Sequence, residues 1–114
     1  MKIYHNPRCA KSRHALTELQ HCKVDVEVVD YQLNPMSKIE LQALVQLLAL
    51  KPSQIVRKGE ELYKTAFKDK QISEDEWLDI LVQYPKLIER PIIVNGNKAI
   101  IGRDAIELTK FLVL

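Results

Sequence analysis

The stretch KIYHNPRCAKSR, residues 2–13, decides how the rest of the sequence is interpreted. It begins as a short apolar strand, Ile3-Tyr4, and breaks at Asn6-Pro7, a pair typical of turns. A helix is expected to follow, with Cys9 in its first turn. Strand, tight turn and helix start in this order predict a cysteine held at the N-terminus of a helix.

A thiol at that position is activated by its surroundings. Unpaired backbone N–H groups and the positive end of the helix dipole both favour the thiolate. Arg8, Lys11 and Arg13 add positive charge on either side of Cys9, which also lowers a cysteine pKa. Helix N-termini bind phosphate-like anions as well. The stretch therefore predicts a reactive cysteine beside an oxyanion site; the alternative is a buried, inert cysteine with solvated basic neighbours.

Composition limits the class of protein. The 114 residues suit one compact domain, and 46% of them are hydrophobic, enough for a core. A net charge of +2 is too small to indicate binding to nucleic acid or to an anionic membrane surface. There is no apolar stretch long enough to span a bilayer and no signal peptide, so we expect a cytoplasmic protein. We also expect it to be a monomer.

The two cysteines, Cys9 and Cys22, are too few for a secreted disulfide scaffold. On one continuous helix they would lie roughly 20 Å apart, at about 1.5 Å per residue, which is beyond the reach of a disulfide. With these cysteines and three histidines, no zinc site is expected, and no bound cofactor.

Outward from the first stretch, the chain alternates between strand and helix patterns. A helix is predicted from Ala10 to His21, followed by the segment VDVEV at residues 24–28, which alternates with period two as a half-buried strand does. Strand, helix and strand at this spacing predict a βαβ unit whose two strands are parallel.

A helical segment of about residues 37–84 comes next. Two capping boxes, Ser37-x-x-Glu40 and Ser73-x-x-Glu76, predict the starts of its main helices. A short turn at residues 53–56 and a weakly patterned helix at residues 60–67 are expected between them. The apolar face predicted for the first helix consists of Ile39, Leu41, Leu44, Val45, Leu47 and Leu48.

The chain then returns to strands at residues 92–94 and 98–101, joined by the hairpin signal Asn95-Gly96. Asp104-x-x-Glu107 starts a final helix with the apolar residues Ile106, Leu108, Phe111 and Leu112. The order is βαβ, helical insertion, ββα. It predicts an α/β thioredoxin-like fold, a single domain over residues 1–114. Such folds place a cis-proline before the third strand, opposite the reactive cysteine, and Pro91 is the proline in that position.

The chain resembles a short branch of the glutaredoxin-coupled arsenate reductase family along nearly its whole length. The matching motifs are Ile3-Tyr4-His5-Asn6-Pro7-Arg8-Cys9 with Ser12-Arg13, Asn34-Pro35, Arg57-Lys58, Arg90-Pro91-Ile92 and Gly102-Arg103. The resemblance implies that Cys9 is the nucleophile and that Arg57, Arg90 and Arg103 bind the oxyanion. It also implies that His5 helps to keep Cys9 a thiolate. Arg13 and Ser12 are expected to support the thiolate too, Ser12 by a hydrogen bond to the sulfur.

The predicted reaction is reduction of arsenate to arsenite through a covalent cysteine–arsenic adduct. Because Ser12 stands where a Cys-x-x-Cys enzyme has its second cysteine, an external thiol must complete the reduction. The resemblance implies glutathione as co-substrate and glutaredoxin as partner. The family's best-studied type has small residues after the cysteine, whereas this chain has Ala10-Lys11. The sequence leaves open whether Lys11 assists the anion or blocks its approach, and what Cys22 does.

The sequence excludes two other classes of enzyme and leaves two non-enzymatic classes open. A phosphatase-type reductase needs Cys-x5-Arg, but the required position is Ala15, and a general dithiol oxidoreductase is excluded by Ser12. A redox-sensing or regulatory protein of the same fold, or a redox-inactive binding module, stays open. Taken singly, each of the arginines could also be an ordinary solvated surface residue.

Overall fold

The computed structural model describes residues 1–22 and 25–113. Contacts within the chain divide it into two compact units, one made of Met1–Asn34 with Arg90–Leu114 and the other of Pro35–Glu89. The second unit contains the helical insertion predicted for about residues 37–84. That the whole chain is one domain stays a prediction. No helix in the described part of the chain is both long and apolar enough to cross a membrane.

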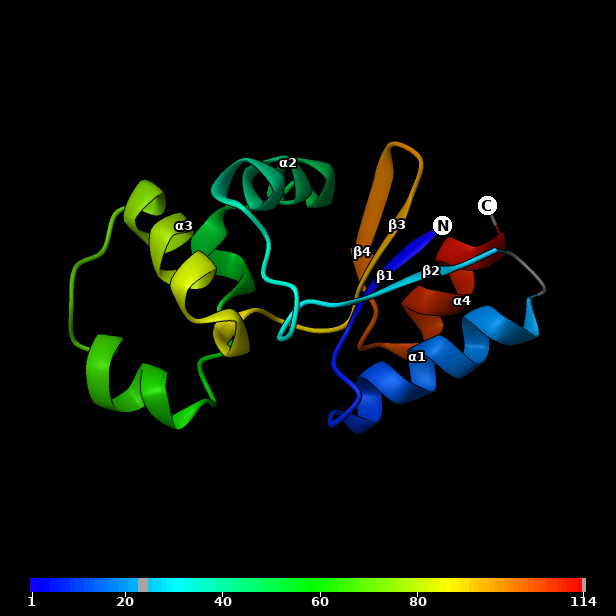
Figure 1. The fold of residues 1–114 in the computed structure, drawn as a ribbon, viewed down its shortest axis with the longest axis horizontal. Coiled ribbons are helices and arrows are strands. Elements are labelled where there is room, and N and C mark those ends of the chain that lie inside the picture. The colour runs from blue at the N-terminus through cyan, green and yellow to red at the C-terminus, as the bar shows by residue number, and fades with distance from the viewer. Residues whose placement is uncertain (23–24, 114) are drawn as a thin grey trace. The chain divides into compact units, whose positions relative to one another are not determined.

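The first unit is built on a four-stranded sheet of order β2-β1-β3-β4 (Figure 1). Its strands are β1 (Lys2–His5), β2 (Glu27–Asp30), β3 (Ile92–Asn95) and β4 (Lys98–Ile101). Strand β1 is parallel to β2 and antiparallel to β3, which is antiparallel to β4. The predicted parallel βαβ pair and the closing hairpin are both confirmed. Gly96 takes φ of 63° in that hairpin, which a glycine adopts without strain.

Two helices, α1 (Ala10–His21) and α4 (Ala105–Val113), pack on one face of this sheet (Figure 1). Ile3 and Ile93 are partners on adjacent strands, so their side chains share a face. They form a fully buried core with Ala15 and Leu19 of α1 and Leu108 of α4. The predicted bounds of α1 are confirmed. This core fixes the end of β1 against the start of α1, where Cys9 lies.

Strand β2 starts later than the alternating pattern predicted, at Glu27 instead of residue 24; Val24 itself lies outside the described residues. The start is set by pairing with β1, because Glu27 N–H donates to the Met1 carbonyl at 2.8 Å. Since β2 is an edge strand, Val28 is 47% exposed although it belongs to the alternating apolar pattern. In α4, Ile106 is likewise 67% exposed, whereas the predicted core residue Leu108 is buried.

The second unit contains α2 (Lys38–Leu48), η1 (Pro52–Ile55), η2 (Tyr63–Phe67), α3 (Glu74–Gln83) and η3 (Pro85–Leu87). Both predicted helix starts are confirmed, since Ser37 and Ser73 accept hydrogen bonds from the N–H groups of Glu40 and Glu76. The η2 segment is a π-helical turn. The burial predicted for Ile39 is wrong, because Ile39 is 81% exposed. It lies about 200° around the helix from Leu41, on the opposite side from the buried residues.

Gly102, which follows β4, is packed too closely for a side chain. It is buried, it donates its N–H to the Pro91 carbonyl at 2.8 Å, and a Cβ there would lie 2.7 Å from Ile93 Cδ1. Gly102→Ala must displace a core side chain and is expected to lower the free energy of unfolding by about 1–3 kcal/mol. Urea denaturation measures this value. Gly59→Ala is the matched control, since nothing lies within 4 Å of its Cβ position; equal stability changes would contradict the packing argument.

Candidate active site

The turn between β1 and α1 places Cys9 at the first position before the helix. Cys9 is the N-cap residue, with extended backbone angles of φ −102° and ψ 122°. Its N–H donates to the Asn6 carbonyl, and the Arg8 N–H donates to Asn6 Oδ1, both at 3.0 Å. Buried Asn6 therefore closes the turn with its backbone and its side chain. The thiol is half-buried and free, and Cys22 is free and exposed, which agrees with the predicted lack of a disulfide between them.

The pKa of the Cys9 thiol lies below its ordinary value. Burial raises the pKa, but hydrogen bonds to the sulfur outweigh burial. They come from the backbone N–H of Ser12, the Arg90 side chain and the backbone N–H of Lys11, and the charge of Arg90 adds to them. The first turn of α1 and one guanidinium thus stabilise the thiolate together, as expected for a cysteine at a helix start.

Ser12 hydrogen-bonds the sulfur through its backbone. Its backbone N–H, rather than its hydroxyl, is the group that lowers the Cys9 pKa. The hydroxyl is completely buried, lies 2.6 Å from His5 Nδ1 and accepts the Asn6 N–H at 3.0 Å. His5 reaches it because His5 follows Ile3 by two residues and so points to the helix-covered face of β1. The Ser12 hydroxyl therefore ties the strand end to the turn.

The pKa of His5 is lowered, first by burial and also by the charge of Arg13, against the opposing charge of Asp30. The lowered pKa favours the neutral form of the ring, which shares a hydrogen bond with the Ser12 hydroxyl. Arg13 stabilises the turn on its exposed side, because its guanidinium donates to the Pro7 carbonyl at 3.0 Å. Both residues act on the loop that holds Cys9, and their role in supporting the thiolate stays a prediction.

Ser12→Ala tests the hydrogen bonds beneath the turn. The substitution removes the partner of the buried Asn6 N–H and of His5 Nδ1, so the free energy of unfolding should fall by about 1–3 kcal/mol. Chemical denaturation measures the loss. Thr17→Ala on the same helix removes an exposed hydroxyl bonded to the Arg13 carbonyl and should change stability by less than about 0.5 kcal/mol. A Ser12→Ala protein as stable as the control would show that these bonds contribute little.

Arg90 is the arginine that the structure brings to the thiol. It precedes β3, and the Arg90–Pro91 peptide bond is cis, the geometry that the fold analogy predicted there. Burial disfavours the charge of Arg90, yet its pKa is raised because of its hydrogen bond to Cys9 and its interactions with Tyr31. Tyr31 is a buried residue just beyond β2 that the sequence patterns did not single out. Its signal, an aromatic residue directly after a strand end, is too common to be specific.

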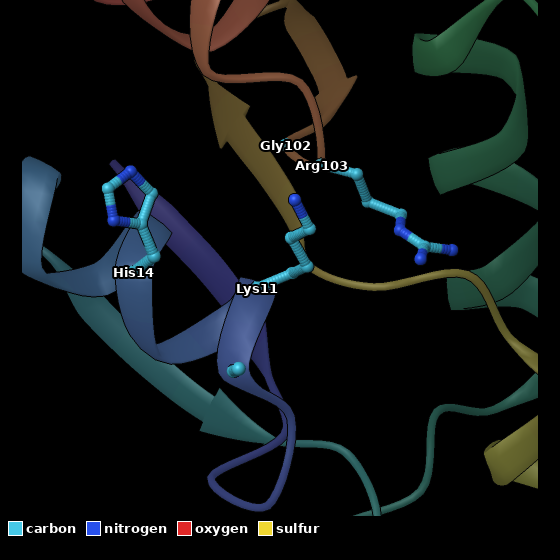
Figure 2. A pocket seen from close by; sticks show the side chains of 5 residues that line it. Lys11, His14, Gly102 and Arg103 are labelled. Carbon is cyan, nitrogen blue, oxygen red and sulfur yellow. The ribbon is translucent and has the colours of Figure 1, made fainter.

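The other two predicted oxyanion-binding arginines lie in different surroundings. Arg103 is exposed and lines a pocket of about 340 Å³ with Ala10, Lys11, His14 and Gly102 (Figure 2). Arg57 belongs to the second unit. Its guanidinium is paired with the Glu60 carboxylate, and its backbone N–H donates to the Leu87 carbonyl at 2.7 Å. Oxyanion binding by Arg57, Arg90 and Arg103 stays a prediction.

Comparison with known proteins identifies the family. The family model described as ArsC family matches residues 4–111, which is nearly the whole chain. The chain belongs to the ArsC family. The match includes Cys9, Arg90 and Arg103, so the turn and the residues around it lie within the shared part of the sequence.

ArsC relatives of known sequence cover most of this chain. It is 42% identical over 105 residues to the uncharacterized protein YfgD of Escherichia coli K12, an alignment covering 90% of this chain and 88% of that one. It is 38% identical over 103 residues to the arsenate reductase of Haemophilus influenzae, with 89% of each chain covered.

Solved ArsC structures share the fold. A putative arsenate reductase from Yersinia pestis has a TM-score of 0.89 at 40% identity, with 96% of this chain and 97% of that chain covered. An arsenate reductase from Vibrio cholerae has a TM-score of 0.88 at 38% identity, with the same coverage. The predicted α/β thioredoxin-like fold with a helical insertion is thereby confirmed.

Proposed function

We propose that this chain reduces arsenate to arsenite through a covalent Cys9–arsenic adduct, which glutathione and glutaredoxin resolve. The observation that carries the proposal is the Cys9 thiol at the N-terminus of α1, with a lowered pKa and a hydrogen bond from Arg90. Relatives named arsenate reductase, such as that of Haemophilus influenzae, support arsenate as the substrate. We place the activity in the cytoplasm and assign it to a monomer.

The first step requires an anion to approach an anionic sulfur. Arsenate is a tetrahedral oxyanion with one to two negative charges near neutral pH, so repulsion must be offset before bond formation. Arg90 at the sulfur and Arg103 at the nearby loop are the candidates in the first unit, because guanidinium groups bind such oxygens in pairs. Arg57 is a further candidate on the family resemblance alone. Stabilisation of developing charge by such groups contributes several kcal/mol.

Cys9 then forms an S–As bond while one As–O bond breaks, and the departing oxygen takes up protons and leaves as water. In the second step the glutathione thiolate attacks the Cys9 sulfur. The S–As bond breaks and its electron pair stays on arsenic, which goes from As(V) to As(III) and leaves as arsenite after proton uptake. The two sulfurs become a mixed disulfide. The reduction of arsenic by two electrons thus balances the oxidation of two thiols.

Glutaredoxin completes the cycle in this proposal. Its thiolate attacks the glutathione sulfur of the mixed disulfide, and Cys9 is released as a thiolate. This chain does not resolve the disulfide itself, because Ser12 occupies the resolving position and Cys22 lies at the far end of α1. The external thiols are required for every turnover.

Chromatographic separation of arsenate and arsenite tests the proposal. Arsenite should form in the complete mixture of protein, arsenate, glutathione and glutaredoxin, and formation should stop after about one equivalent when glutaredoxin is left out. Omission of glutathione should prevent release of arsenite. No arsenite from protein whose Cys9 alkylates rapidly would refute the proposal and favour a redox-sensing protein of this fold.

A further inference from the structure

The pocket between the start of α1 and the loop after β4 lies beside the thiol rather than on it. Ala10, Lys11 and His14 of α1 line one side, and Gly102 and Arg103 line the other. Cys9 is not among the described residues that line it, although Ala10 and Lys11 follow it directly in the chain. Figure 2 shows the Lys11 amino group reaching toward the Gly102–Arg103 loop. Because the backbone N–H of Lys11 is hydrogen-bonded to the Cys9 sulfur, the pocket adjoins the thiol.

The pocket is shaped and charged for an organic anion. Its volume of about 340 Å³ falls at the lower end of the range for small-molecule sites, roughly 300–1,000 Å³, and exceeds what a single oxyanion fills. Lys11 and Arg103 are cationic, His14 adds a polar ring, and none of the described residues that line the pocket carries a carboxylate. The acidic residue Asp104 directly follows Arg103 in the sequence. Its Oδ1 accepts hydrogen bonds from the N–H groups of Ile106 and Glu107 and so caps α4.

The walls of the pocket are held in place by the fold. Gly102 is buried and bonded through its N–H to the Pro91 carbonyl, so the loop is tied to the segment that carries Arg90. On the other side, α1 is anchored by Ala15 and Leu19 in the core. The first turn of α1 has no acidic residue and contains Lys11, the opposite of the charge that stabilises a helix start.

We propose that this pocket binds the carboxylates of the small thiol that attacks the Cys9 adduct, with Lys11 as the main contact. The inference rests on the proposed function, which requires an external thiol at the Cys9 sulfur in every turnover. Lys11 is two residues from Cys9, and its backbone N–H bonds the Cys9 sulfur, so a thiol whose carboxylate it holds is bound close to the adduct. Lys11 then binds the reductant and leaves the oxyanion to the arginines. Glutathione, with two carboxylates, has the required chemistry.

Binding of S-methylglutathione, which is unreactive, tests the inference by amide NMR of the reduced protein. Chemical-shift changes should concentrate at residues 10–14 and 102–103. Lys11→Glu should weaken the affinity at least about fivefold, the size expected for reversing one exposed charge contact. Lys98→Glu, at the opposite end of β4, is the matched control and should leave the affinity unchanged. Both lysines are exposed, so neither variant should perturb the fold.

Two further probes identify the chemistry that is recognised. The dimethyl ester of S-methylglutathione lacks the carboxylate charges and should bind more weakly than the acid by a similar factor. Inorganic phosphate should not displace S-methylglutathione from residues 10–14 with equal affinity. The inference is overturned if the shifts lie elsewhere, if Lys11→Glu binds as well as the wild type, if the ester binds as tightly as the acid, or if phosphate competes equally.

The titration contains no arsenate, so its outcome is separate from that of the reductase assay. Site-specific binding of S-methylglutathione without arsenate reduction would leave the thiol site standing and remove the proposed substrate. Arsenate reduction without binding at residues 10–14 and 102–103 would leave the reaction standing and remove the thiol site.

Discussion

Cys9→Ser is expected to abolish arsenate-dependent turnover, lowering the rate by more than about 1,000-fold to that of the reaction without enzyme. A serine hydroxyl stays protonated, whereas the pKa of the Cys9 thiol is lowered, and serine cannot form the mixed disulfide. The measurement is NADPH consumption in a coupled assay with arsenate, glutathione, glutaredoxin and glutathione reductase.

Cys22→Ser is the matched control, because Cys22 is the other free cysteine and is exposed at the end of α1. Its turnover should equal that of the wild type. Residual arsenate-dependent activity in Cys9→Ser, together with loss of activity in Cys22→Ser, would identify Cys22 as the nucleophile and contradict this account.

Arg90→Ala is expected to give the next largest effect. It removes the side-chain hydrogen bond and the positive charge that lower the Cys9 pKa, so the thiol pKa should rise. It also removes one of the guanidinium groups that we propose bind the oxyanion, so kcat/KM for arsenate should fall by about 100- to 1,000-fold. Arg90→Lys keeps the positive charge but lacks the planar guanidinium, so its kcat/KM should lie between those of Arg90→Ala and the wild type. Steady-state kinetics and the pH dependence of thiol alkylation measure the two effects separately.

Arg8→Ala is the control for Arg90, since Arg8 is an exposed arginine directly before Cys9. Its kinetics should stay close to those of the wild type, and near-ultraviolet circular dichroism should show that both variants keep their packing. If Arg8→Ala and Arg90→Ala had the same effect, general charge near the loop, rather than the placement of Arg90, would explain the reactivity.

Local signals in the sequence predicted much of the fold. Ser37 and Ser73 start their helices as predicted because a capping bond involves residues only three positions apart. The turn at Asn6-Pro7 and the start of α1 are similarly local. These local features are sufficient to place Cys9 at a helix N-terminus without any tertiary contact.

Features that depend on contacts with residues distant in sequence could not be predicted from local patterns. The start of β2 depends on its pairing with β1, and the exposure of Val28 depends on β2 being an edge strand. The apolar residues Ile39 and Ile106 are on exposed helix faces although the pattern included them in the core. A single strand or helix does not reveal which neighbour covers it.

The site divides in the same way. Cys9 and the backbone of its turn were predictable from the first stretch of sequence, whereas the proximity of Arg90 needed the fold analogy that placed Pro91 before β3. The contact between the Ser12 hydroxyl and His5 could not be predicted, because the strand face that presents His5 to α1 emerges only from the packed sheet. Arg57, paired with Glu60 in the other unit, remains to be tested by substitution.

The central claim is that Cys9 is a stabilised thiolate, and the pH dependence of its alkylation by iodoacetamide tests this most directly. In the Cys22→Ser protein, Cys9 alone reacts, and its rate follows the thiolate fraction. Because the pKa is lowered, the rate should reach its plateau at lower pH than for free cysteine, whose pKa is about 8.5. A midpoint clearly below that value is the predicted result. A midpoint at or above it would contradict the account.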